Sequence, residues 1–125
     1  DHEPFAAAPG RVTLVTDAMA AAGASDGRYQ LGPLAVDVLG GIARLREGGA
    51  IAGSTLTQDA ALRWAVETAG VPLTDAVTAL TSTPAQVVGQ GERLGHLRSG
   101  YAADAVLLDP ELRVTSVWCD GERIA

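Results

Sequence analysis

The sequence predicts an α/β fold, and three observations support this prediction. Residues 11–18 are a short apolar and β-branched run that ends in a carboxylate, a pattern typical of a buried parallel strand. Apolar residues recur at helical spacing over 53–89, and strand-like runs return over 105–125. A parallel strand needs parallel neighbours, yet the other strand-like runs have the pattern of hairpins. We therefore expect the chain to be the last piece of a larger α/β protein.

The composition excludes several classes of function. The chain of 125 residues has 9 basic residues against 15 acidic ones, which argues against binding to a nucleic-acid backbone. It contains no Lys, so Schiff-base and P-loop chemistry are excluded. No apolar run approaches the ~20 residues that cross a bilayer, and Cys119, the only cysteine, is read as a small packed hydrophobe. We expect a soluble, cytoplasmic protein that binds neither nucleic acid nor membrane.

The first half of the chain predicts a strand, a loop and a small β-meander. Asp17 ends the strand-like run, where catalytic groups collect in α/β folds, and an equally good interpretation is that it caps the next turn. Residues 29–34 form a weak run broken by a Gly-Pro pair. The runs 36–39 and 42–45 are joined by two glycines, which is typical of a hairpin turn.

Three helices are predicted next. The first opens within 53–59, where Thr55 and Gln58 have capping-box spacing, and it ends before Pro72. Its buried face is predicted to consist of Leu62, Ala65, Val66 and Ala69. The second helix is predicted over 74–80, and the third has Thr83 as its N-cap.

The tail returns to β structure. Residues 105–110 and 114–118 are predicted strands, and Asp120 with Gly121 predicts a hairpin turn into 122–125. His96 lies in the polar connector that precedes them, where a solvated histidine is the more typical interpretation. Two distant histidines and one cysteine cannot complete a zinc site alone.

Three stretches together resemble one enzyme family. They are residues 14–18 (LVTDA), 51–57 (IAGSTLT) and 100–109 (GYAADAVLLD). In this order they resemble the closing third of the N-acetylglucosamine-6-phosphate deacetylases, which are amidohydrolases, and the resemblance covers residues 11–125. The third stretch is shared across amidohydrolases, whereas the first two in this spacing are more specific.

The resemblance implies a fold and a domain organisation. The fold would be the C-terminal portion of a (β/α)8 barrel, with its last strand, a hairpin and three helices, plus strands of a small β-sandwich. Residues 1–10 would be an atypical N-terminal end or junction, and residues 11–90 the last part of the catalytic barrel. Residues 91–125 would be a connector and the C-terminal strands of the sandwich.

The resemblance also implies a site. Asp17 matches the aspartate that takes a proton from a metal-bound water, passes it to the departing amine and can touch the metal. Ile51, Ala52 and Gly53 match a loop that contacts the substrate, and core packing stays open as the alternative interpretation of Ile51. The implied cofactor is a divalent ion, zinc or iron. The implied partners are an amino-sugar phosphate, the missing N-terminal part of the same protein and further copies in a homo-oligomer.

The resemblance is incomplete in one respect. The family takes its metal from a Glu and two His on earlier strands, and none of them can be matched in this chain. We therefore expect the 125-residue chain alone to be inactive and to bind no metal tightly. Two alternatives stay open: another amidohydrolase, such as an aminoacylase or dihydroorotase relative, and a non-catalytic assembly module.

Overall fold

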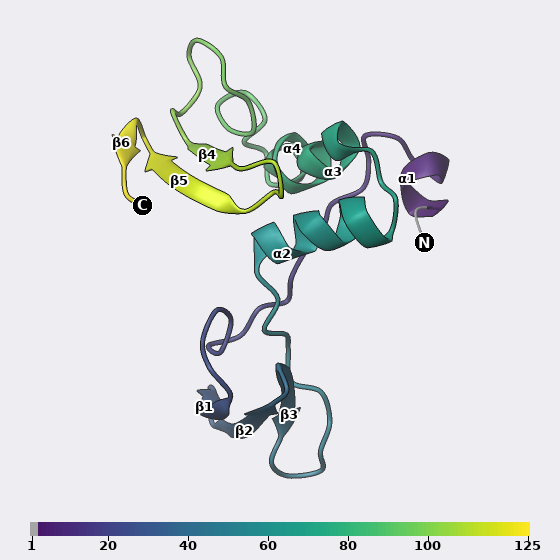
Figure 1. Ribbon diagram of the computed structural model, residues 1–125, viewed down its shortest axis with the longest axis vertical. Helices are drawn as coiled ribbons and strands as arrows, with labels where there is room; N and C mark the ends of the chain where they lie inside the picture. The colour runs from purple at the N-terminus through teal and green to yellow at the C-terminus, as the bar shows by residue number, and fades with distance from the viewer. Residues whose placement is uncertain (1–2) are drawn as a thin grey trace. The chain divides into compact units, whose positions relative to one another are not determined.

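The computed structural model describes residues 3–125, which form two compact units (Figure 1). One unit is Val15–Ala61, and the other combines residues 3–14 with Leu62–Ala125. His2, one of the two histidines considered as metal ligands, lies outside the described residues.

The unit Val15–Ala61 is built on a three-stranded antiparallel sheet. Its strands are β1 (Gly27–Leu31), β2 (Leu34–Leu39) and β3 (Ile42–Leu45), in that order. The predicted hairpin of β2 and β3 is confirmed, with Leu39 opposite Ile42. The weak run 29–34 is instead divided between two strands, because its Gly-Pro pair forms a second two-residue turn.

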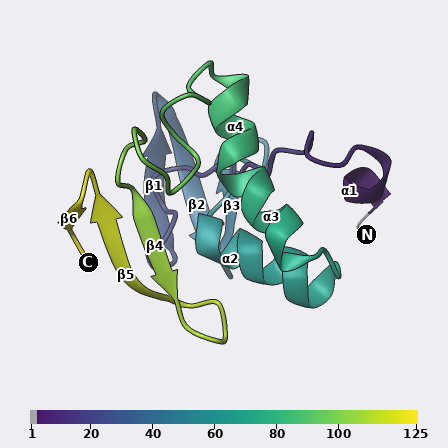
Figure 2. The ribbon, with the colours of Figure 1, turned by 90° about the horizontal axis from the view of Figure 1, so that it is seen from above.

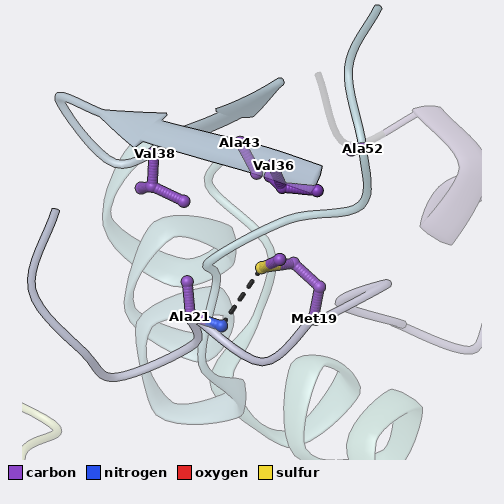
Figure 3. Packing of buried hydrophobic residues seen from close by; sticks show 6 residues of the cluster. All are labelled: Met19, Ala21, Val36, Val38, Ala43 and Ala52. Atoms are coloured by element: carbon purple, nitrogen blue, oxygen red, sulfur yellow. Dashed lines mark hydrogen bonds between the residues drawn. The ribbon is translucent and has the colours of Figure 1, made fainter. Parts of the chain in front are cut away.

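The core of this unit lies between the sheet and two loops (Figure 3). Val36 and Val38 alternate with the exposed Asp37 along β2, as expected for a half-buried strand. The Met19 sulfur faces the sheet and also accepts a hydrogen bond from the Ala21 N–H at 3.1 Å. The buried residues therefore join the loop that follows residue 17 to the sheet; they are Met19, Ala21, Val36, Val38, Ala43 and Ala52.

The predicted buried strand over 11–18 is not formed within the described residues. The segment has one β-bridge, a parallel one between Ala18 and Ser54, and Val15 is 74% exposed. A parallel strand is buried only when strands and helices cover it on all sides. The residues 3–125 supply no such neighbours, so this prediction is wrong for the chain as described.

The second unit is mainly helical at its centre. Its helical segments are α1 (Glu3–Ala7), α2 (Gln58–Arg63, which begins in the first unit), η1 (Trp64–Thr68), α3 (Leu73–Leu80) and α4 (Ser82–Val87). The segment η1 is a π-helix, in which the Ala69 N–H donates to the Trp64 carbonyl at 3.0 Å.

The predicted helices are present, but two of their starts differ. The first helix begins at Gln58, because the Thr55 hydroxyl donates to the Gly41 carbonyl at 2.6 Å instead of capping it. The helix α4 begins at Ser82, and the Thr83 hydroxyl donates to the Gly10 carbonyl at 3.2 Å. The two predicted N-caps are therefore wrong, since both hydroxyls bond to distant parts of the chain.

The core of the second unit confirms the predicted helical face. Leu62, Ala65 and Ala69 are buried, and Val66 is half-buried beside them. The segment that precedes residue 15 joins this core, because Leu14 packs there and its N–H donates to the Ala79 carbonyl at 3.0 Å.

The tail strands form the predicted hairpin. They are β4 (Ala105–Leu108), β5 (Val114–Cys119) and β6 (Glu122–Arg123), in an antiparallel sheet in that order. Figure 2 shows β4 and β5 side by side. Cys119 ends β5 and is exposed, so the interpretation of it as a packed hydrophobe is wrong.

Candidate functional site

The candidate acid–base residue, Asp17, is an exposed aspartate with an unusual backbone. Its φ angle is +51°. A left-handed conformation costs a residue with a side chain about 1 kcal/mol, and Asp is among the residues that adopt it most readily. The neighbouring residue Ala18 pairs with Ser54 in the parallel bridge. Asp17 therefore stands at the point where the chain enters the first unit, in a conformation that its surroundings must maintain.

Ser54 makes the contacts that surround Asp17. Its N–H donates to the Asp17 carbonyl at 2.7 Å, and its carbonyl accepts from the Met19 N–H at 2.9 Å. Its hydroxyl donates to the Thr16 carbonyl. Ser54 lies within the motif of residues 51–57, and the resemblance assigns it no role. Its partners lie far away in the chain, so only its position beside the glycine of the motif could have drawn attention to it.

The fold of the chain requires a glycine at position 53, because of its backbone angle and its close neighbours. Its φ is +71°, and a Cβ at this position would lie 3.0 Å from the Asp17 carbonyl oxygen and 3.3 Å from the Met19 Cβ. The sequence interpretation was that a glycine lets a ligand approach closely. The structure adds a second reason, because the space beside Gly53 is occupied by the backbone of Asp17.

The other two predicted substrate-contacting residues face different surroundings. Ile51 is 70% exposed and pairs with Arg44 in an isolated bridge, so its interpretation as a core residue is wrong for this structure. The Ala52 side chain packs in the core of the unit, and its N–H donates to the Ala43 carbonyl at 3.0 Å. Ile51 is thus the member of the trio whose side chain is free to meet a ligand.

A shallow, open depression of about 320 Å³ lies beside this loop. It is lined by Gly41, Ile42, Ala43, Ile51, Gly53, Ser54, Thr55 and Leu56. Its lining contains apolar side chains and two hydroxyl-bearing residues. A depression of this kind can form one wall of a ligand site but does not enclose a ligand.

The described residues do not form a complete metal centre. Among residues 3–125, no three side chains of His, Cys, Asp or Glu gather closely enough to hold a metal ion. A catalytic divalent ion usually takes three protein ligands, and Asp17 offers one carboxylate. His96 belongs to the other unit, where its ring packs edge-on against Tyr101 with ring centroids 5.7 Å apart. No helix among the described residues has the length and apolar character to cross a membrane.

Comparison with known proteins defines the class of this chain. Asp17 is exposed and is hydrogen-bonded to Ser54, which follows the glycine of the loop. Residues 8–124, which include both, match the amidohydrolase family model. The chain belongs to the amidohydrolase family.

Within this family the chain is similar to amino-sugar-phosphate deacetylases. It is 44% identical over 112 residues to the N-acetylgalactosamine-6-phosphate deacetylase of Escherichia coli O157:H7. The aligned residues are 90% of this chain and 29% of that protein. It is 35% identical over 113 residues to the N-acetylglucosamine-6-phosphate deacetylase of Caenorhabditis elegans, covering 90% of this chain and 27% of that protein. The chain thus spans less than a third of the length of these two relatives.

A solved structure agrees. A variant N-acetyl-D-glucosamine-6-phosphate deacetylase from Mycobacterium smegmatis, in complex with N-acetyl-D-glucosamine-6-phosphate, has 42% sequence identity and a TM-score of 0.84. The match covers 98% of this chain and 32% of that one. The predicted mixed α/β character and the predicted resemblance are therefore confirmed, whereas the barrel and the sandwich stay predictions.

Proposed function

We propose that the complete protein in which this sequence occurs removes the acetyl group from an amino-sugar 6-phosphate, with Asp17 as the acid–base residue. The similarity to deacetylases of both N-acetylgalactosamine-6-phosphate and N-acetylglucosamine-6-phosphate, at 44% and 42% identity, carries the proposal. The exposure of Asp17 and its position beside the glycine-containing loop are consistent with it.

The chemistry proposed for Asp17 needs an ionised carboxylate that can hold a proton for a short time. It accepts a proton from water as the water oxygen attacks the acetyl carbonyl carbon. The C–N bond then breaks, and Asp17 returns the proton to the amine nitrogen, which leaves as a neutral amine. Acetic acid and the amino-sugar phosphate are the immediate products, and Asp17 ends the cycle in its initial state. The second proton of the attacking water stays on the acetic acid, which releases it to solvent and becomes acetate.

Substrate contact is proposed for the loop with Ile51, Ala52 and Gly53. The exposed Ile51 side chain would pack against the apolar side of the sugar or the acetyl methyl group. Ala52 and Gly53 would contribute backbone rather than side-chain contacts, since the Ala52 side chain is buried in the core.

Amidohydrolases of this family typically depend on a metal ion. Residues 3–125 do not by themselves fit a complete site for such an ion. We propose that zinc or iron binds to ligands supplied by the rest of the complete protein, with Asp17 beside it.

Within that protein we propose residues 11–90 as the end of the barrel and residues 91–125 as connector and sandwich strands. Residues 1–10 would be the junction, and copies of the complete protein would form a homo-oligomer.

Two substrates must be compared, because they differ only in the configuration at one carbon of the sugar ring. We propose N-acetylglucosamine 6-phosphate as the substrate. N-acetylgalactosamine 6-phosphate is the second candidate, favoured by the 44% identity to a deacetylase of that sugar. The ratio of kcat/KM for the two sugars, measured with the complete protein, decides between them.

The experiment on Asp17 is its replacement by Asn. The complete protein with Asp17→Asn should bind the sugar phosphate nearly as before, because Asn has the same shape. Its kcat should fall by about 10²–10⁴-fold, since the amide can neither accept nor return the proton. Turnover within a few-fold of the unsubstituted protein would remove Asp17 from the mechanism. Absence of turnover of either sugar by the unsubstituted protein would favour another amidohydrolase reaction or an assembly module.

A further inference from the structure

We propose that Ser54 is a positioning residue for the Asp17 carboxylate. The inference rests on the proposed acid–base role of Asp17 and adds to it the group that fixes its backbone angles, and with them the direction of its Cα–Cβ bond. Ser54, Asp17 and the other residues that Ser54 contacts all lie within the unit Val15–Ala61.

Ser54 bonds to both peptide groups that flank Asp17. The peptide group before Asp17 carries the Thr16 carbonyl, which accepts from the Ser54 hydroxyl. The peptide group after Asp17 carries the Asp17 carbonyl, which accepts from the Ser54 N–H at 2.7 Å. Because peptide groups are planar, φ and ψ of Asp17 are the rotations between these two planes. Bonds to both planes therefore fix both angles, and with them the direction of the Cα–Cβ bond.

This fixing is needed because Asp17 has a φ of +51°. An aspartate without such bonds would relax toward the commoner negative φ, and its carboxylate would then point elsewhere. A displacement of about 1 Å at a catalytic group is enough to lower a rate by about 10²-fold. The two bonds from Ser54 oppose that relaxation directly.

The Ser54 hydroxyl has a second hydrogen-bond partner, and this partner restricts which side chains can replace serine at this position. Its oxygen accepts a hydrogen bond from the Leu56 N–H at 3.1 Å while its proton is donated to Thr16. A side chain at this position must therefore donate and accept at once. Thr can do both, whereas Ala can do neither and leaves one N–H and one carbonyl without this partner.

The experiment is Ser54→Ala in the complete protein, assayed with N-acetylglucosamine 6-phosphate and N-acetylgalactosamine 6-phosphate. We expect kcat to fall by about 10–100-fold, because the carboxylate is no longer held in place. KM should stay within about threefold, since a positioning residue acts on the step more than on ground-state binding. Ser54→Thr should restore most of kcat. Ser116→Ala, which removes the hydroxyl of a buried serine in β5, is the matched control and should leave kcat unchanged.

A double-mutant cycle separates this role from a general effect on folding. If Ser54 acts through Asp17, then Ser54→Ala should cause no further loss in a protein that already carries Asp17→Asn. An equal loss of residual turnover in both backgrounds would overturn the proposal. Should the residual turnover of Asp17→Asn lie below detection, the KM-against-kcat split and the Thr rescue decide instead.

The outcomes distinguish this inference from the proposed function. Normal turnover by Asp17→Asn contradicts the role of Asp17 itself. A large loss with Asp17→Asn but near-normal turnover with Ser54→Ala contradicts only the positioning role. A loss with Ser54→Ala that Ser54→Thr does not recover, together with a lowered unfolding midpoint, would identify a structural serine and would also overturn the inference.

Discussion

At the scale of single residues, the backbone is crowded beside Asp17, the candidate acid–base residue. Gly53 and Asp17 both have positive φ angles, and their backbones approach each other closely. The structure contains other left-handed glycines where a Cβ would meet open space, Gly48 among them. Comparison of a crowded and an uncrowded glycine therefore separates the effect of conformation from the effect of contact.

We predict that Gly53→Ala destabilises the complete protein more than Gly48→Ala does. Both changes place a Cβ on a left-handed residue, at about 1 kcal/mol each. Gly53→Ala adds a contact at 3.0 Å with the Asp17 carbonyl oxygen, which should cost about 1–3 kcal/mol more. The measurement is the unfolding midpoint in urea.

The same pair of variants tests the link to function. Gly53→Ala should also lower kcat, because the contact displaces Asp17, whereas Gly48→Ala should leave kcat unchanged. Equal unfolding midpoints for the two variants would show that the loop yields to the added methyl group.

At the scale of the element, hydrogen bonds to two aspartate side chains stabilise the hairpin of β2 and β3. The Asp26 carboxylate accepts from the Gly40 and Gly41 N–H groups and so orders the turn. Across the hairpin, Arg46 donates two hydrogen bonds to Asp37, the shorter at 2.8 Å. The hydrogen bond from Arg46 holds the pKa of Asp37 below its usual value of 3.8.

The direction of this pKa shift predicts a pH dependence. A carboxyl whose pKa is lower in the folded state contributes stability above its unfolded pKa. For Asp37 that contribution is lost as the pH falls below about 3.8 and through the folded pKa. Asp37→Asn should therefore make the unfolding temperature fall less on acidification from about pH 5 to pH 3.

The effect of Asp37→Asn should be small and should shrink further in about 1 M salt, because both side chains are about half exposed. Glu47→Gln, in the turn that follows β3, removes the same charge and is the control. An equal change in both variants would assign the effect to net charge instead of to the ion pair.

The elements that sequence reasoning predicted correctly are those with local causes. The sequence signals of the turn at Gly40 and Gly41 and of the helix α3 lie within a few positions of each other, although Asp26 also binds the turn. The helix starts at Thr55 and Thr83 were misplaced because distant carbonyls take their hydroxyls. The π-helix had no recognised signal, since its buried residues also fit an ordinary helical period.

The candidate site follows the same rule. Asp17, Ile51, Ala52 and Gly53 came from motif resemblance, and the structure places Asp17 beside Gly53. Ser54 was missed because its role depends on Thr16 and Asp17, far away in the chain. The burial expected for residues 11–18 failed because a strand cannot be buried by neighbours that the described residues do not supply.

At the scale of the whole molecule, residues 3–125 offer one candidate carboxylate and do not bring other metal-binding side chains to it in a cluster. Among residues 3–125 there is no cluster of metal-binding side chains. The chain spans 29% of the Escherichia coli relative and 32% of the Mycobacterium smegmatis structure.

We predict that the purified 125-residue chain does not hydrolyse either amino-sugar phosphate above a metal-only blank. Titration calorimetry with Zn²⁺ should detect no tight site, because three or more protein ligands are needed and one is offered. Asp17→Asn in the same chain is the control. Saturable turnover by the chain that is lost in Asp17→Asn would show that these residues assemble a centre by themselves.

The parallel bridge between Ala18 and Ser54 has a consequence for changes of chain length in the first unit. The chain leaves and returns at this one point, so all three strands of the first sheet lie on an excursion closed at its base. Insertions or exchanges at the outer turns, such as Gly32–Pro33, change the length of the excursion without altering the path that leads to Asp17. We therefore expect a residue inserted at these turns to leave the hydrogen bond between the Ser54 N–H and the Asp17 carbonyl in place.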